Sequence, residues 1–192
     1  YRGVRRLSQE NSAHINDRYP NIMRRVSGYN LDEFMTDSSF NLTKMIVGSE
    51  GTLCTVTEVK INLVACPTMT SLSVVHFRDI FGASEAVKDI LEHSPSSIEI
   101  MDQNVLERSR ASTGLSSNLD FIEGNPGAML VVEFYGETEP ELQSKMDNLK
   151  ADMSRKGHGY ACVNLMDKSA QGSVWAVRKN GLGLLMSMHG DA

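Results

Sequence analysis

Between residues 68 and 166, strand-like and helix-like segments follow one another in an order that few folds accommodate. Four short apolar segments have the composition and length of strands: Leu72 to Phe77, Ser97 to Met101, Ala128 to Tyr135 and Tyr160 to Met166. A helix is predicted between the first two, because its apolar residues share one face: Ala83, Val87, Ile90 and Leu91. A second helix precedes the last strand. It begins at the capping-box pattern Thr138-x-x-Glu141 and stops near Gly157.

The resulting order, β-α-β-β-α-β, is that of a ferredoxin-like split motif. We therefore expect an α+β fold with one antiparallel sheet and these two helices on one face. A further helix is expected from Asp102 to Arg110, with Asp102 capping its start. Residues 112–127 hold Gly, Ser, Asn and Pro, and they predict a long connection. A last helix is expected from about Ser173 to Met188, weakened in its middle by two glycines.

A glycine-rich run precedes this block. Val47-Gly48-Ser49-Glu50-Gly51-Thr52-Leu53 joins a helical segment, Leu42 to Ile46, to the alternating segment Thr55 to Leu63, which predicts a half-buried strand. Glycines three apart can bring bare backbone N–H groups against a ligand and can adopt left-handed dihedral angles. A tight helix-to-strand turn without a ligand is the alternative. The Pro after Cys66 marks a boundary, so we predict two parts, 1–66 and 67–192.

Composition and charge exclude several classes of protein. The formal net charge of −5 gives no electrostatic footprint for nucleic acid. No apolar run approaches the about 18 residues that a transmembrane segment needs. The three cysteines form no C-x-x-C pair, so they predict no zinc or iron–sulfur site and fit buried thiols in a reducing cytoplasm. The histidines share no metal-ligand spacing, and His76 is expected to be a packed or surface histidine rather than a catalytic base. Because the chain opens on Tyr1 without a signal peptide, we expect a piece of a longer protein.

The string KMIVGSEGTL, followed by TVTEVKINL, resembles the flavin loop of the FAD-linked oxidases of the vanillyl-alcohol-oxidase type, which include the glycolate oxidase subunit and D-lactate dehydrogenase. Two later strings support the resemblance. Residues 98–102, IEIMD, are similar to a Glu-Leu-Met-Asp-like string of the family's cap domain, and residues 174–178, VWAVR, to its Leu-Trp-x-x-Arg string. Residues 24–31, RRVSGYNL, resemble the large members that carry an extra C-terminal iron–sulfur region.

The resemblance assigns parts and roles to this chain. It implies that residues 1–66 are the C-terminal portion of the FAD-binding domain, and that residues 67–192 are an incomplete FAD-linked oxidase C-terminal domain, the cap. Arg178 would hold the substrate carboxylate, whereas from the residues alone it would pack over Trp175. Cys54 stands where the family usually has Gly. Backbone groups of the glycine run and of one residue beyond it would lie along FAD: Gly48, Ser49, Gly51, Thr52 and Val56.

The predicted function is that of a fragment of an FAD-dependent oxidoreductase. It would oxidise a D-2-hydroxy acid, lactate-like or glycolate-like, by hydride transfer to flavin. FAD is expected in the full-length protein but not bound to this fragment, which we expect to be inactive, because the N-terminal lobe with the pyrophosphate loops is absent. The family's histidine-rich string is also absent, so no catalytic residue or metal ligand is expected within the chain.

The expected partners are a small-molecule hydroxy acid, the missing N-terminal FAD lobe and the C-terminal region of the same chain. The alternative function is a stand-alone ferredoxin-like module that binds a small molecule or regulates another protein. A cytoplasmic location is expected, and peripheral membrane attachment of the parent stays open. The sequence indicates neither the identity of the substrate, nor the electron acceptor, nor the oligomeric state.

Overall fold

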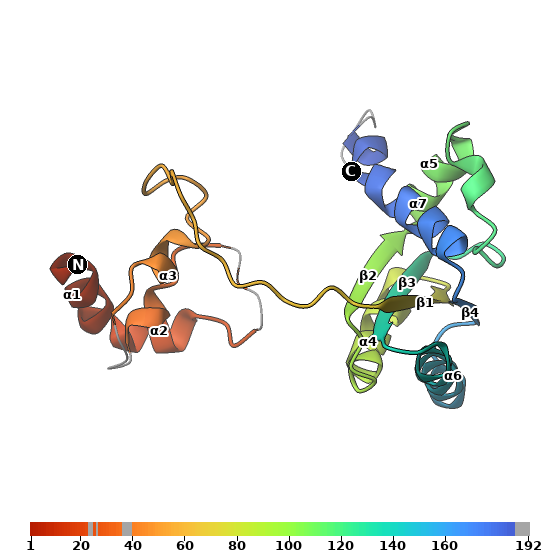
Figure 1. Cartoon of the computed structure of the whole chain (residues 1–192), viewed down its shortest axis with the longest axis horizontal. Coiled ribbons are helices and arrows are strands. Elements are labelled where there is room, and N and C mark those ends of the chain that lie inside the picture. Colours follow the sequence, from red (N-terminus) through yellow and green to blue (C-terminus); the bar gives the residue numbers. More distant parts are fainter. Residues whose placement is uncertain (23–24, 26, 36–39, 187–192) are drawn as a thin grey trace. The chain divides into compact units, whose positions relative to one another are not determined.

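The computed structural model describes residues 1–22, 25, 27–35 and 40–186. The chain divides into two compact units, Tyr1–Leu63 and Val64–Ala192 (Figure 1). No helix in the described ranges is long and apolar enough to cross a membrane.

The second unit is built on one four-stranded antiparallel sheet. Its strands are β1 (Met69–Phe77), β2 (Ser97–Asp102), β3 (Ala128–Gly136) and β4 (Ala161–Leu165). The strand order is β2-β3-β1-β4, and every neighbouring pair is antiparallel. This is the order of the predicted ferredoxin-like fold, so the fold class and the four predicted strands are confirmed.

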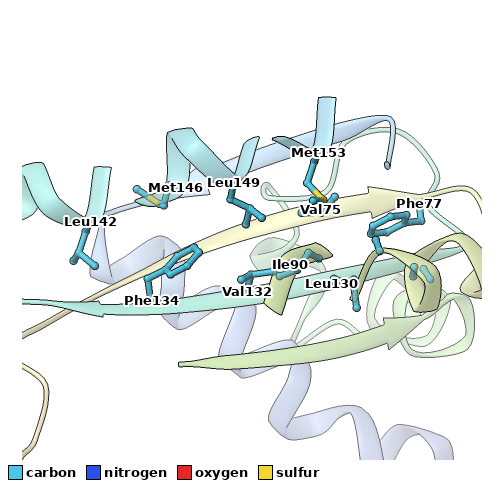
Figure 2. Packing of buried hydrophobic residues seen from close by; sticks show 13 residues of the cluster. Val75, Phe77, Ile90, Leu130, Val132, Phe134, Leu142, Met146, Leu149 and Met153 are labelled. Atoms are coloured by element: carbon cyan, nitrogen blue, oxygen red, sulfur yellow. The ribbon is translucent and has the colours of Figure 1, made fainter. Parts of the chain in front are cut away.

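The two predicted helices both cover the same face of this sheet. They are α4 (Ile80–Leu91) and α6 (Glu139–Lys156), and both lie below the sheet in Figure 1. Buried residues of β1, β3, α4 and α6 form a first core on this face of the sheet. Figure 2 shows four side chains of α6 that face residues of β1 and β3 in this core. These side chains are fully buried, and they are the ones whose spacing predicted the helix: Leu142, Met146, Leu149 and Met153.

The opposite face of the sheet is also covered, which the sequence did not lead us to expect. Helices α5 (Gln103–Ala111) and α7 (Lys168–Met186) pack there over a second core. The second core is formed by buried residues from three strands, two helices and a connection: Leu72, Val74, Met101, Leu106, Phe121, Met129, Val131, Val174 and Val177. The sheet is therefore the middle layer of three.

Helix α7 starts earlier than predicted, and it continues through the glycines that were expected to weaken it. A Cβ atom at Gly181 would lie 3.3 Å from Cγ1 of Val105, so the missing side chain lets α7 approach α5 closely. Packing against α5 thus offsets the unfavourable helix propensity of glycine. The predicted end of this helix, residues 187 and 188, lies outside the described residues.

Helices α5 and α6 are capped at the residues that the sequence predicted. The Asp102 carboxylate accepts the backbone N–H of Val105 at 3.0 Å, which confirms its capping role. Thr138 Oγ1 accepts the N–H of Glu141 at 3.4 Å, and α6 ends at Gly157 in the left-handed region. The Glu141 carboxylate in turn accepts the N–H of Glu137, the residue before the cap, at 3.0 Å.

The first unit contains helices that the polar composition of its sequence concealed. They are α1 (Arg2–Glu10), α2 (Ser12–Arg18), a short 3-10 helix (Leu31–Phe34) and α3 (Thr43–Ile46). Helix α3 was predicted, and the 3-10 helix lies where the string RRVSGYNL indicates a turn that leads into a short helix. Of the apolar residues that the structure describes in this unit, Ile15 and Phe34 are buried.

The strand predicted from Thr55 to Leu63 is wrong for the chain as described. These residues form no strand, and Val59, Ile61 and Leu63 are exposed. A strand satisfies its backbone groups by pairing with a neighbour. The described residues of this chain provide no such neighbour for the segment, so the alternating pattern has no sheet to join.

A group of charged side chains joins the ends of α4 and α6. Lys156 Nζ lies 2.9 Å from Asp89, 3.1 Å from Glu92 and 3.1 Å from Asp152. His93 contacts Asp152, whose side chain is only 10% exposed. The His93 hydrogen bond, together with Lys156 and a neighbouring arginine, holds the pKa of Asp152 well below its usual range.

We expect Asp152→Asn to lower the melting temperature of the chain at neutral pH and to flatten its acid response. Because the folded-state pKa lies below the unfolded value of about 4, the carboxylate stabilises the fold above that pH. This contribution is lost as the pH falls further toward the folded-state pKa. Thermal unfolding followed by circular dichroism between pH 7 and pH 3 measures it.

Asp120→Asn is the matched control, because Asp120 is an exposed carboxyl in the connection before β3. It should follow the wild-type profile. An Asp152→Asn profile that loses as much stability as wild type between pH 7 and pH 3 would contradict the assignment.

Candidate functional site

The glycine run folds into two successive β-turns. The first is closed by the Ser49 N–H donating to the Ile46 carbonyl at 3.0 Å. Val47 has φ −62° and ψ 122°, and Gly48 has φ +83°, which are the angles of a type II turn, where the third residue needs positive φ. The second turn is closed by Thr52 N–H donating to the Ser49 carbonyl at 3.0 Å.

This second turn has positive φ at both central residues. Glu50 has φ +50° and Gly51 has φ +75°, as in a type I′ turn. Both glycines of the loop thus adopt the left-handed dihedral angles that this residue permits. Cys54 is not among the residues with positive φ, so its Cβ is compatible with the backbone at this position.

Two side chains from the preceding segment hold the loop in place. Asn30 donates through Nδ2 to the carbonyls of Lys44 and Val47, at 3.2 and 3.1 Å, and so satisfies acceptors at the end of α3. The Tyr29 hydroxyl lies 2.8 Å from Thr52 Oγ1, which itself donates to the Ser49 carbonyl at 2.6 Å. The loop is thus fixed at its entrance and at its exit.

The backbone of the loop offers donors to a ligand. Among the described residues, no acceptor takes the N–H groups of Gly48, Glu50 or Gly51. A Cβ atom at Gly51 would meet nothing within 4 Å, so the space beside it is open. A row of unpaired N–H groups beside open space is suited to polar acceptor atoms of a cofactor. Val56 follows the loop and is exposed, with no contact that fixes a role for it.

Arg178 lies in the other unit, on α7. Two turns of this helix are anchored in the second core by Val174 and Val177, which are fully buried. The Arg178 guanidinium binds Glu99 of β2: Nε donates to Oε2 at 2.9 Å and Nη2 donates to Oε1 at 3.2 Å. Its partner is therefore a carboxylate and not the ring of Trp175, which was the alternative from the residues alone. The side chain of Arg178 remains 53% exposed.

The other titratable candidates have structural roles. His76 is fully buried, and its Nε2 accepts the N–H of Glu123 at 3.1 Å, so it is packed as predicted. Burial lowers the pKa of His76, which favours the neutral ring. In the described part of the chain, no group of three metal-ligating side chains is assembled.

The expectation of buried thiols holds only in part. All three cysteines are free: Cys54 and Cys66 are exposed, and Cys162 is half-buried. Burial raises the pKa of the Cys162 thiol to about 11, so this group stays protonated and unreactive at neutral pH.

Comparison with known families identifies the second unit. Residues 66–192, more than half of the chain, match the model of the FAD linked oxidases, C-terminal domain. The chain belongs to this family. The strings that carried the resemblance in the cap, around Glu99 and around Arg178, both lie within the matched residues.

Curated relatives extend over the whole chain. D-2-hydroxyglutarate dehydrogenase of Pseudomonas putida is 27% identical over 200 residues, which cover 100% of this chain and 20% of that protein. D-lactate dehydrogenase of Anaerostipes hadrus is 25% identical over 74% of this chain and 30% of that protein. Glycolate oxidase subunit GlcD of Bacillus subtilis is 26% identical over 77% of this chain. The chain thus spans about a fifth of the first of these relatives.

A solved structure shares the fold. Alkyldihydroxyacetonephosphate synthase matches with a TM-score of 0.52 at 18% identity, over 79% of this chain and 29% of that one. At this identity the match supports the architecture alone.

The structure adds three residues to which the sequence assigned no role. Tyr29 and Asn30 hold the glycine loop, and Glu99 binds Arg178. Tyr29 and Asn30 belong to the string RRVSGYNL, and Glu99 to IEIMD, so the resemblance drew attention to both strings without revealing these contacts. Arg24 and Val26 of the first string lie outside the described residues.

We expect Gly51→Val to abolish flavin retention in the full-length protein while the cap unit stays folded. A β-branched residue is strained at φ +75°, and its side chain would occupy the open space beside the loop. The flavin content of purified protein, from its absorbance spectrum, is the measurement.

Gly157→Val controls for backbone strain alone. Gly157 has φ +74°, and a Cβ atom at this position, as at Gly51, would meet no other atom within 4 Å. The backbone strain of a valine should therefore be similar at both positions, about 1–3 kcal/mol. This variant should keep its flavin. Equal flavin content in both variants would remove the loop from the cofactor site.

Proposed function

We propose that this chain is part of an FAD-dependent oxidoreductase that oxidises a D-2-hydroxy acid. The membership of residues 66–192 in the FAD linked oxidase family supports the cofactor. The names of the curated relatives support the substrate class, because 2-hydroxyglutarate, lactate and glycolate are all 2-hydroxy carboxylates. The observation that carries the proposal to this chain is the exposed guanidinium of Arg178, which still has donors for a carboxylate.

Residues 1–66 are proposed to be the C-terminal portion of the FAD-binding domain, and residues 67–192 an incomplete cap domain. The division of the chain into two compact units near residue 64 and the start of the family match at residue 66 support this assignment. The exposed alternating segment before the boundary fits a strand whose neighbours belong to the FAD-binding domain outside this chain.

The glycine loop is proposed to contact FAD through its backbone. Among the described residues the N–H groups of Gly48 and Gly51 have no acceptor, the space beside Gly51 is open, and Ser49 and Thr52 complete the two turns. Val56 is assigned to the same site from the resemblance alone. When bound, FAD supplies the acceptor for the hydride that leaves the 2-carbon of the substrate.

Arg178 is proposed to bind and orient the substrate carboxylate. A planar guanidinium matches a carboxylate through two parallel hydrogen bonds and keeps its charge at every working pH. Glu99 raises the pKa of Arg178 further. With the carboxylate held, the 2-carbon and its hydrogen are fixed relative to the cofactor. The base that takes the hydroxyl proton is assigned to the part of the protein outside this chain.

The alternative of a stand-alone ferredoxin-like module is less well supported. It would explain the sheet and its helices, but it does not explain the double turn with unpaired N–H groups, nor the relatives that span the full chain. The proposed partners are a hydroxy acid, the N-terminal FAD lobe and the C-terminal region of the same protein. We further propose a cytoplasmic location, with peripheral membrane attachment left open, because the three cysteines are free thiols.

We expect Arg178→Lys in the full-length protein to raise KM and lower kcat/KM for its hydroxy acid. A lysine offers one point charge in place of a planar fork, so the carboxylate would be held but poorly oriented. A misplacement of this kind lowers the rate between about ten- and a hundredfold. Steady-state kinetics with a D-2-hydroxy acid and an artificial electron acceptor measure both constants.

Arg155→Lys is the matched control, because Arg155 is an exposed arginine on α6, which covers the other face of the sheet. It should leave both constants unchanged. Wild-type kinetics in Arg178→Lys would show that Arg178 is a structural residue and would remove the proposed substrate site.

A further inference from the structure

The pair between Arg178 and Glu99 uses only one edge of the guanidinium. Glu99 accepts one hydrogen bond from Nε at 2.9 Å and one from Nη2 at 3.2 Å. An arginine has five N–H donors in a planar arrangement. Three donors therefore remain, one on Nη2 and two on Nη1, and no acceptor among the described residues takes them. The edge formed by Nη1 and Nη2 is itself a fork that fits a carboxylate.

Both partners of the pair stand on rigid elements. Glu99 is in β2, opposite Val131 in the register with β3. Helix α7 is fixed to β1 through Gln171, whose Nε2 donates to the Thr70 carbonyl at 2.9 Å. Because neither backbone is free to shift, the carboxylate of Glu99 determines where the guanidinium points.

We propose that Glu99 is a positioning residue that holds Arg178 by its Nε–Nη2 edge and presents the Nη1–Nη2 edge to the substrate carboxylate. This inference rests on the proposed function of Arg178. It specifies that one guanidinium bridges two carboxylates, one from the protein and one from the substrate. The charge of Glu99 also offsets that of Arg178, which reduces the attraction for any second anion. The affinity for that anion then depends on how well its shape matches the remaining fork.

A competing arrangement predicts the opposite effect of removing Glu99 on substrate affinity. If Glu99 and the substrate bound the same edge of Arg178, Glu99 would be an internal competitor. Its removal would then tighten substrate binding. If Glu99 positions the arginine, its removal weakens binding, because the long side chain loses the contact that orders it.

The first experiment is Glu99→Gln in the full-length protein with Arg178 intact. The amide keeps the size of the side chain but loses the charge and one acceptor. We expect KM for the hydroxy acid, and the Kd of its 2-oxo acid product measured by calorimetry, to rise several-fold, while flavin content and melting temperature stay at wild-type values. A KM and a Kd that are unchanged or lower would overturn the proposal.

The matched control is Glu133→Gln. Glu133 lies on β3 in register with Ser97 of β2, and its carboxylate accepts a hydrogen bond from Ser97 at 3.2 Å. It carries the same charge on the neighbouring strand but makes no contact with Arg178 among the described residues. Its substitution should change neither KM nor Kd.

The second experiment uses guanidinium ion as a probe. If Glu99 had only a structural role, replacing it would not change how far guanidinium restores activity. Arg178→Ala should lower kcat/KM, and added guanidinium chloride should restore part of the activity, with sodium chloride at the same ionic strength as the control. The carboxylate of Glu99 would hold the free guanidinium where the arginine head stood. We expect the restoration to be lost in the double variant Arg178→Ala, Glu99→Gln.

The outcomes separate this inference from the proposed function. If Arg178→Ala keeps wild-type kinetics, the substrate role of Arg178 fails. If Arg178→Ala is impaired but guanidinium restores it equally with Glu99 and with Gln at this position, or restores it in neither background, the positioning role of Glu99 fails while the substrate role of Arg178 stands.

Discussion

The pairing of β1 with β3 is the interaction on which the second unit depends. These two central strands match residue for residue from Met69 with Gly136 to Phe77 with Ala128. Their side chains alternate between two faces, so every second residue enters the core under α4 and α6 and the others enter the core under α5 and α7. A slip of one residue would exchange the two sets. The register therefore fixes both outer layers, and with them the position of Arg178 over β2.

Much of this unit could be predicted because its local signals agree with its tertiary structure. The apolar spacing of α6, the cap at Thr138 and the stop at Gly157 each specify the same helix. The cover of the second face could not be predicted in this way, since the benefit of Gly181 in α7 appears only in its close approach to Val105 of α5. The predicted strand from Thr55 to Leu63 failed for the related reason that a strand requires a partner, and the described chain contains none for it.

In the candidate site, too, local features could be predicted from the sequence and long-range contacts could not. The positive φ of Gly48 and Gly51 could be predicted, because only glycine adopts such angles without strain. The contacts that hold the site could not, since they join residues far apart in sequence: Tyr29 reaches Thr52, and Glu99 reaches Arg178. No periodicity or motif spacing reports such pairs. The sequence led us to propose residues that would touch the ligands, and the structure adds the side chains that contact these residues.

We propose that this chain combines a flavin-binding loop with a carboxylate-binding arginine. The most direct test is an anaerobic titration of the full-length protein with D- and L-2-hydroxy acids and with a matching alcohol that lacks the carboxylate, followed by flavin absorbance. We expect the D-acid alone to bleach the flavin absorbance, and to bleach it less at each concentration in Arg178→Lys. Equal bleaching by the acid and the alcohol, or the absence of flavin from the intact protein, would contradict it.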